Sequence, residues 1–176
     1  MTSVMHDHEH TARGVSGALD RGILLVGRSL CWANGLLVII IVLQVTLRYG
    51  FRSGMVALEE LEWHLYALAF MFGLSYDLVT DAHVRVDLIY GRLSPKTREW
   101  IDLLGTVFLL LPFTLVITYF GCEFFYDSWV HQEQSLAAMG LPFRWAIKGV
   151  IPLSFVFLTL AAISRIIKAI SAILKN

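Results

Sequence analysis

Apolar residues are gathered into four long runs along this chain, and short polar stretches separate the runs. The runs cover about residues 23–47, 58–79, 100–120 and 145–163. Because a helix rises about 1.5 Å per residue, runs of roughly 20 residues reach across a hydrocarbon core of about 30 Å. The pattern predicts an all-α integral membrane protein with four transmembrane helices in a membrane domain over 23–165. A flexible polar N-terminus, 1–22, and a basic tail, 166–176, would flank this domain.

Composition supports a membrane protein and narrows its function. Hydrophobic residues make up 57% of the chain and charged residues 16%, whereas a soluble domain carries about a quarter charged residues. The formal net charge of zero predicts no nucleic-acid partner. Cys31 and Cys122 form no Cys-x-x-Cys motif, and no metal-ligand spacing or nucleophile with its base is present. We therefore expect no enzyme, no metal site and no cofactor.

Lysine and arginine are distributed unevenly among the polar stretches. Ten of the 14 lie before residue 29, between residues 80 and 99, or after residue 164. The other four lie in or beside the two remaining connections. The positive-inside rule then places both termini and the loop 80–99 in the cytoplasm, with 48–57 and 121–144 outside.

The second apolar run carries a stripe of polar and small residues. The residues spaced three and four apart, which share one helix face, are Glu59, Glu62, Tyr66, Ala69, Gly73 and Asp77. Ala69 and Gly73 form a small-x-x-x-small step that lets another helix approach closely. We expect this face to contact protein. The alternative is an ion or proton site, because acids within a membrane span are functional candidates by default.

Charged residues also gather around the first predicted loop, in the order Arg48, Arg52, Glu59, Glu60 and Glu62. Ion pairs among them would tie the outer ends of the first two helices together, and the alternative is solvated charge at the membrane surface. Asn34 and Gln44 can each hydrogen-bond to a neighbouring helix, a contribution of roughly 1 kcal/mol.

Local signals mark the third and fourth helices. Ser94 followed by Pro95 predicts an N-cap and a first helical residue. Pro112 and Pro152 lie inside the predicted helices, where each removes a backbone donor and can cause a kink. His64 is the one histidine within a predicted span, and a membrane haem ordinarily requires two at matching depths, so we expect no haem.

Short residue groups follow one another in a fixed order along the four runs. They are Gln44-Val45-x-x-Arg48-Tyr49-x-Phe51, Glu59-Glu60-Leu61, Gly73, His83-Val84-Arg85-Val86-Asp87, Leu93-Ser94-Pro95, Trp129 with Glu133-Gln134-Ser135, Leu141-Pro142-x-x-Trp145, and Ile151-Pro152. This order resembles the small membrane subunit of tripartite ATP-independent periplasmic (TRAP) transporters, the DctQ-like family. The resemblance extends over about residues 23–165.

The resemblance implies a scaffold subunit in a bacterial or archaeal cytoplasmic (inner) membrane, surrounded by lipids. Its partners would be a large multispan subunit with the sodium and substrate sites, and a periplasmic binding protein that delivers an organic acid. No substrate-binding or catalytic residue is then expected in this chain. The positions expected to fix the bundle or the subunit contact are Arg48, Glu59, Glu60, His83, Arg85 and Asp87. A further hypothesis is that the outer loop 121–144 helps to dock the binding protein.

Two other function classes compete with the scaffold. A self-sufficient four-helix exporter would act as a homodimer, but no acid lies at the centre of any predicted span to couple it to protons. A small membrane oxidoreductase would need redox cysteines or haem ligands that the sequence does not supply.

Overall fold

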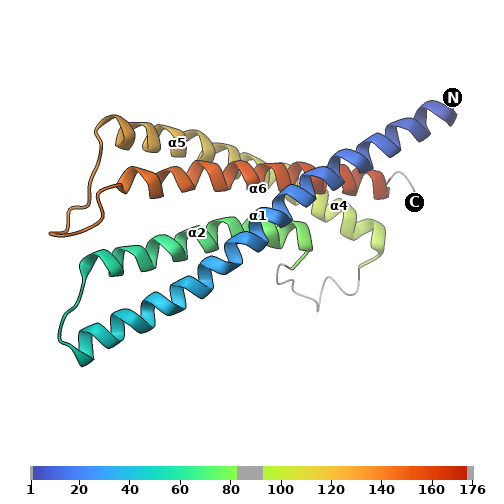
Figure 1. Cartoon of the computed structure of the whole chain (residues 1–176). Coiled ribbons are helices and arrows are strands. Elements are labelled where there is room, and N and C mark those ends of the chain that lie inside the picture. Colours follow the sequence, from blue (N-terminus) through green and yellow to red (C-terminus); the bar gives the residue numbers. More distant parts are fainter. Residues whose placement is uncertain (1, 83–92, 174–176) are drawn as a thin grey trace.

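The computed structural model describes residues 2–82 and 93–173, and every regular element in this part of the chain is helical. The elements are α1 (Thr2–Gly50), α2 (Val56–Thr80), α4 (Pro95–Gly105), the π-helical turn η1 (Thr106–Leu110), α5 (Leu111–Val130) and α6 (Arg144–Ile173). Because α4, η1 and α5 follow one another without a break, they form one long rod (Figure 1). The predicted all-α fold is therefore confirmed.

The helices define two ends of the bundle. We call the end with the connections 51–55 and 131–143 the outer end, and the end with Asp81 and Ser94 the inner end. The α1–α2 pair and the α5–α6 pair lie close together near the inner end and diverge toward the outer end (Figure 1). The beginning of α1 and the end of α6 lie on the inner side.

Three helical stretches in the described part of the chain are long and apolar enough to cross a membrane, namely Ser16–Gly50, Lys96–Val130 and Arg144–Ile173. They contain the first, third and fourth predicted spans. The second predicted span, 58–79, lies in α2, which is not among the three. With 25 residues α2 is about 37 Å long, but it carries four carboxylates. The count of four spans and the orientation of the termini stay predictions.

The helices extend beyond the apolar runs that predicted them. The segment 1–22, expected to be flexible, is helical from Thr2 onward. α5 continues to Val130 and α6 to Ile173, so the outer connection between them is 131–143 rather than 121–144. The physical reason is that an apolar run marks only the part of a helix suited to hydrocarbon, whereas backbone hydrogen bonding continues into the polar flanks.

α6 lies at the centre of the bundle, where it contacts all the other elements. The buried core lies toward the inner end and consists of Ile23, Leu78, Leu158, Ala161 and Ala162. Ala161 and Ala162 are small, so they allow neighbouring helices to approach α6 closely. The buried core thus ends where the charged residues of the inner end begin.

Glycines at three helix contacts also allow close approach. A Cβ atom at Gly27 would lie 2.6 Å from Cδ2 of Tyr76, and one at Gly149 would lie 2.9 Å from Cε2 of Phe125. One at Gly121 would lie 3.3 Å from Cγ2 of Ile151. A Cβ atom at Gly73 would meet none of the described residues within 4 Å. The close approach expected at Gly73 is therefore not made within the described part of the chain.

The rod formed by α4, η1 and α5 follows the local sequence signals. The Ser94 hydroxyl accepts a hydrogen bond from the Thr97 amide at 3.2 Å, which confirms the predicted N-cap. Further along, the Leu111 amide donates to the Thr106 carbonyl, five residues earlier, directly before Pro112. Because a proline ring crowds the carbonyl four residues before it, a widened turn at this point relieves the clash.

Candidate functional site

Glu59 joins the outer ends of α1 and α2. Its Oε1 accepts hydrogen bonds from Nη1 of Arg48 and from Nε2 of Gln44, both at 3.2 Å. The Arg48–Glu59 pair and the interhelical bond of Gln44 are therefore present as predicted. Arg52 has a left-handed backbone with φ of 51° and makes no ion pair with any described residue. Asn34 is exposed, and the expected interhelical bond is not made within the described part of the chain.

We predict that the Arg48–Glu59 pair contributes little to the free energy of unfolding, because both side chains are about half exposed. Pairs of this kind contribute roughly 0.2–1 kcal/mol. The variants Arg48→Glu and Glu59→Arg should each lower the recovery of assembled complex, and the double variant should recover part of the loss. A double-mutant cycle on complex yield measures this coupling, and strictly additive losses would argue against the pair.

Glu60 joins α2 to the outer connection 131–143. Its carboxylate accepts a hydrogen bond from the Ser135 hydroxyl and a second one from the Leu141 amide at 2.6 Å. Both donors lie more than 70 positions away in sequence, so this contact closes the outer end between the two helix pairs.

Glu133, in the same connection, joins α5 to α6. Its carboxylate forms an ion pair with the Lys148 ammonium. The same carboxylate accepts a hydrogen bond from the Ser128 hydroxyl at 2.7 Å. Arg144 lies 3.5 Å away on the other oxygen. The Lys148 ammonium, followed by Ser128, holds the pKa of Glu133 below its ordinary value of 4.5. The carboxylate is therefore ionised at neutral pH and anchors the connection.

A pH dependence follows from the lowered pKa of Glu133. The stabilisation from this anchor is complete above about pH 4.5, the ordinary value, and is lost as pH falls through the lower pKa of the folded state. Trp129 and Trp145 pack against each other beside the anchor, with ring centroids 4.4 Å apart. Tryptophan emission should stay constant down to about pH 4.5 and change below it. Glu133→Gln should show the changed emission at neutral pH, and identical titrations of the two proteins would contradict the anchor.

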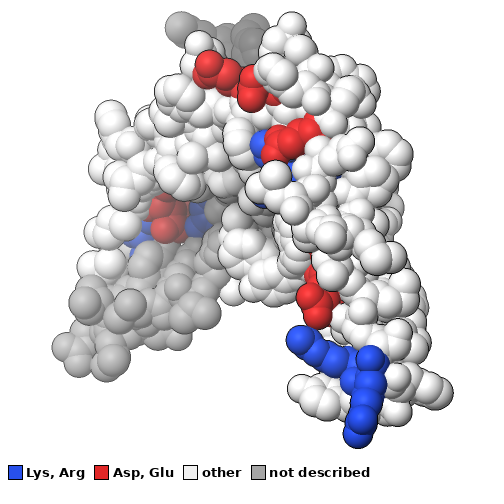
Figure 2. Space-filling view, turned by 90° about the vertical axis from the view of Figure 1, so that its left-hand side faces the viewer, with Lys and Arg blue, Asp and Glu red and all other residues white. Residues whose placement is uncertain are grey.

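Viewed from the outer end, charged side chains form small separate groups on a mostly uncharged surface (Figure 2). Blue and red atoms lie beside each other in the lower groups, whereas the red group near the top has no blue atoms beside it.

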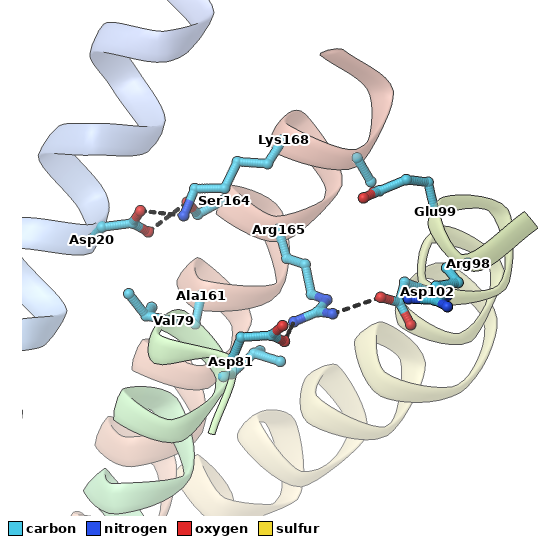
Figure 3. Close-up of a pocket in the computed structure, with 12 residues that line it drawn as sticks. Asp20, Val79, Asp81, Arg98, Glu99, Asp102, Ala161, Ser164, Arg165 and Lys168 are labelled. Carbon is cyan, nitrogen blue, oxygen red and sulfur yellow. Dashed lines mark hydrogen bonds and ion pairs between the residues drawn. The ribbon is translucent and has the colours of Figure 1, made fainter. Parts of the chain in front are cut away.

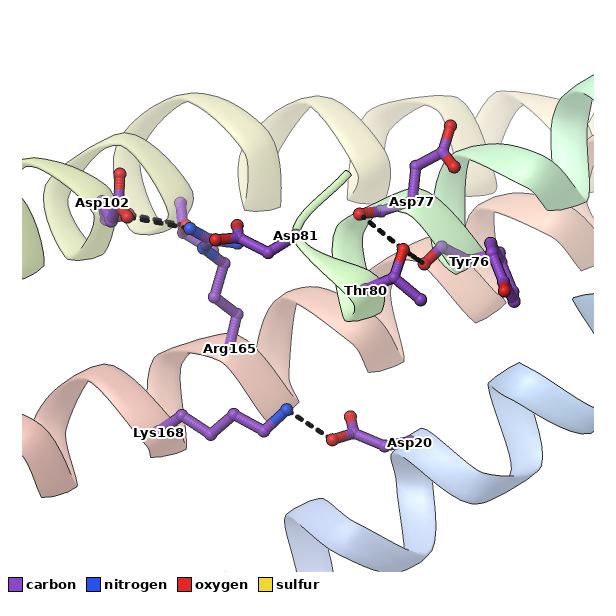
Figure 4. Close-up of polar contacts among 9 residues, drawn as sticks. Asp20, Tyr76, Asp77, Thr80, Asp81, Asp102, Arg165 and Lys168 are labelled. Atoms are coloured by element: carbon purple, nitrogen blue, oxygen red, sulfur yellow. Dashed lines mark hydrogen bonds and ion pairs between the residues drawn. The ribbon is translucent and has the colours of Figure 1, made fainter. Parts of the chain in front are cut away.

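The inner end carries a second set of ion pairs, centred on α6. Arg165 donates through Nη1 to Oδ1 of Asp81 at 2.9 Å and through Nη2 to Oδ2 of Asp102 at 2.8 Å (Figure 4). Lys168 forms an ion pair with Asp20, and the Ser164 hydroxyl donates to Oδ1 of Asp20 at 2.6 Å. Because Asp20, Asp81 and Asp102 belong to three different elements, this network ties α6 to α1, to the end of α2 and to α4.

A pocket of about 440 Å³ lies within this inner network (Figure 3). Its charged lining residues are Asp20, Asp81, Arg98, Glu99, Asp102, Arg165 and Lys168. Leu78, Val79, Ala161 and Ala169 supply its apolar side. The pocket is thus apolar toward the bundle core and charged toward the helix ends.

The stripe predicted on α2 is not the buried face of this helix. The buried residues of α2 are Phe72, Ser75 and Leu78, whereas Tyr66 is 58% exposed. Asp77 points away from α6 and α1 (Figure 4). Glu59 and Tyr66 are exposed, whereas the other members of the stripe are half-buried, so the stripe lies beside the buried face rather than on it. Its proposed contact with another subunit stays a prediction.

The remaining residues predicted as interface positions differ in their surroundings. Oε1 of Glu62 is buried and has no hydrogen-bond partner among the described residues. Ala69 is partly buried. His83, Arg85 and Asp87 lie outside the described residues.

The family model described as tripartite ATP-independent periplasmic transporters, DctQ component, matches residues 37–172. This range begins in the outer half of α1 and includes nearly all of the chain that follows. The chain belongs to the DctQ family. A comparison with curated proteins found no match. DctQ is a family of transporter components rather than of enzymes.

The inner network of this DctQ chain was not predicted from the sequence. Arg165 and Lys168 are two of the basic residues after residue 164 that predict the topology, and their partners lie far away along the chain. One feature of the sequence indicates such a network. Three polar residues, Ser164, Arg165 and Lys168, follow the last apolar run at helical spacing and can face the same neighbours. The choice of Asp20, Asp81 and Asp102 as partners required the tertiary structure.

Proposed function

We propose that this DctQ chain is the fixed scaffold subunit of a TRAP-type secondary transporter in a bacterial or archaeal inner membrane. It has four spans and both termini in the cytoplasm. It supports a large sodium-coupled membrane subunit, which imports an organic acid delivered by a periplasmic binding protein. The substrate and sodium sites belong to the large subunit.

The observation that carries this proposal is the clamping of the bundle at both ends. At the outer end Glu59, Glu60 and Glu133 join α1 to α2, α2 to the outer connection, and α5 to α6. At the inner end Arg165 and Lys168 join α6 to α1, to the end of α2 and to α4. A transport domain that moves needs an immobile wall, and helices linked in this way resist relative sliding.

Hydroxyl groups in the middle of the helices support the same function. Thr114 and Ser154 are buried, and each donates to a carbonyl three residues earlier in its own helix, Leu111 and Ile151 respectively. These side chains therefore satisfy their own polar groups rather than projecting a donor toward a ligand.

A pull-down tests the proposal. Tagged chain is extracted from its native membranes in mild detergent, and mass spectrometry identifies the co-purifying proteins. We expect one much larger multispan protein at equal stoichiometry, and substrate uptake by the reconstituted complex that requires a sodium gradient. Recovery of this chain alone as a stable dimer, with solute flux from it in vesicles, would overturn the scaffold function.

Gly73 gives a prediction about the subunit contact. Because a Cβ atom there meets none of the described residues within 4 Å, Gly73→Leu should disturb the isolated bundle much less than Gly27→Leu. If the stripe of α2 that includes Gly73 contacts the large subunit, the added side chain should weaken that contact about tenfold. The measurement is the amount of large subunit that co-purifies, together with the melting temperature of the isolated chain. Unchanged co-purification and uptake would exclude this face as the contact.

A further inference from the structure

The inner pocket lies at the boundary between the apolar and the charged parts of the bundle. Ala161 on α6 and Leu78 on α2 belong to the buried core and also line the pocket. Arg165 and Lys168, one and two turns further along α6, line its charged side. In a membrane protein such a boundary lies at the level of the lipid headgroups. The pocket is therefore placed to receive the polar part of a lipid.

The charged side chains that line the pocket differ in how fully they are paired with other residues. Arg165 is committed to Asp81 and Asp102. Lys168 pairs with Asp20, but its side chain is 49% exposed and an ammonium group has three donors. Glu99 makes no ion pair with any described residue, and its carboxylate points toward α6 (Figure 3). The pocket thus offers spare donors on one side and an ionisable acceptor on another.

We propose that this pocket binds the headgroup of a phospholipid that carries both a phosphate and a primary ammonium, as in phosphoethanolamine, from the leaflet at the inner end. Lys168 donates to the phosphate, and Glu99 accepts from the ammonium. The volume of about 440 Å³ lies within the range of small-ligand pockets, roughly 300–1,000 Å³. The bound lipid links α4, which carries Glu99, to α6, which carries Lys168.

Charge complementarity selects this headgroup over other phospholipids. The lining holds four carboxylates and three cationic side chains, so an anionic headgroup without an ammonium meets an excess of negative charge. A choline headgroup has the same net charge as ethanolamine but no N–H to donate, so it cannot satisfy the Glu99 carboxylate in the same way. The ammonium is therefore the recognised feature, and the phosphate is the second contact.

The test uses the purified full-length chain, stripped of lipid in detergent. Phosphatidylethanolamine, phosphatidylcholine and phosphatidylglycerol with identical acyl chains are titrated separately, and so is water-soluble glycerophosphoethanolamine. Native mass spectrometry measures retained lipid, and thermal unfolding measures stabilisation. We expect retention and a higher melting temperature with phosphatidylethanolamine alone. Glu99→Gln and Lys168→Gln should each weaken its binding about tenfold.

Glu123→Gln is the matched control, because Glu123 is an exposed carboxylate on α5 that does not line the inner pocket. It should bind phosphatidylethanolamine like the unmodified chain. Equal retention of the ethanolamine and choline lipids, preferential retention of phosphatidylglycerol, or unchanged binding by Glu99→Gln would overturn the proposal. If glycerophosphoethanolamine bound as tightly as phosphatidylethanolamine, the pocket would be a site for a soluble ligand, and the proposal of a membrane lipid would be wrong. If Lys168→Gln unfolds because it loses the ion pair with Asp20, the binding measured for Glu99→Gln tests the proposal instead.

Discussion

Arg165→Ala is expected to destabilise the bundle by about 2–4 kcal/mol. The guanidinium group holds two carboxylates, Asp81 at 2.9 Å and Asp102 at 2.8 Å. The side chains of Arg165 and Asp102 are only 20% and 21% exposed, so removal of the cation leaves a shielded carboxylate facing a second one. Such a loss costs more than the loss of a surface pair, because the Asp102 side chain stays largely shielded from water, although Asp81 is 53% exposed.

Thermal unfolding in detergent measures this effect, and we expect the apparent melting temperature to fall by about 5–10 °C. The melting temperature of Arg165→Lys should lie between those of Arg165→Ala and the unmodified chain. The reason is that a single ammonium cannot bind two carboxylates in the planar geometry of the guanidinium group. Arg52→Ala is the matched control, since Arg52 is exposed and makes no ion pair with the described residues. Equal melting temperatures for Arg165→Ala and Arg52→Ala would contradict the structural role of the inner network.

Gly27→Leu is expected to disrupt the contact between α1 and α2 at a cost of about 3 kcal/mol or more. A Cβ atom at this position lies 2.6 Å from Cδ2 and 3.0 Å from Cβ of Tyr76. The second distance matters because Cβ is fixed to the backbone of α2, so rotation of the ring cannot relieve the overlap. The helices must therefore separate, which exposes the neighbouring core around Ile23 and Leu78.

The same substitution at Gly73 is the control for Gly27. Both glycines lie inside helices, so the change in helix propensity is the same, but only the Cβ atom at Gly27 meets another helix. Gly27→Leu should lower the melting temperature of the isolated chain much more than Gly73→Leu. Adding Tyr76→Ala to Gly27→Leu should restore part of the loss by making room. Equal effects of the two leucine substitutions would show that the packing at Gly27 is not the cause.

The sequence predicted contacts well where the partners are close along the chain. Arg48 and Glu59 are 11 positions apart and are joined by a short connection, so their positions at the ends of two consecutive helices left few alternatives. Ser94 and Thr97 form a cap within one turn. In contrast, Arg165 is 84 positions from Asp81 and 63 from Asp102, and the sequence contains several other acids at the ends of helices.

The sequence by itself determined the helical class, the apolar stretches and the family, because each depends on local composition or on the order of residues along the chain. Only the tertiary structure decided which glycine receives a neighbouring helix and which carboxylates receive Arg165. It also showed that Phe72, Ser75 and Leu78, rather than the stripe through Gly73, form the buried face of α2. The physical reason is that these choices depend on the rotation of each helix about its axis. In a membrane protein both lipid-facing and protein-facing surfaces are apolar, so hydrophobicity alone does not specify that rotation.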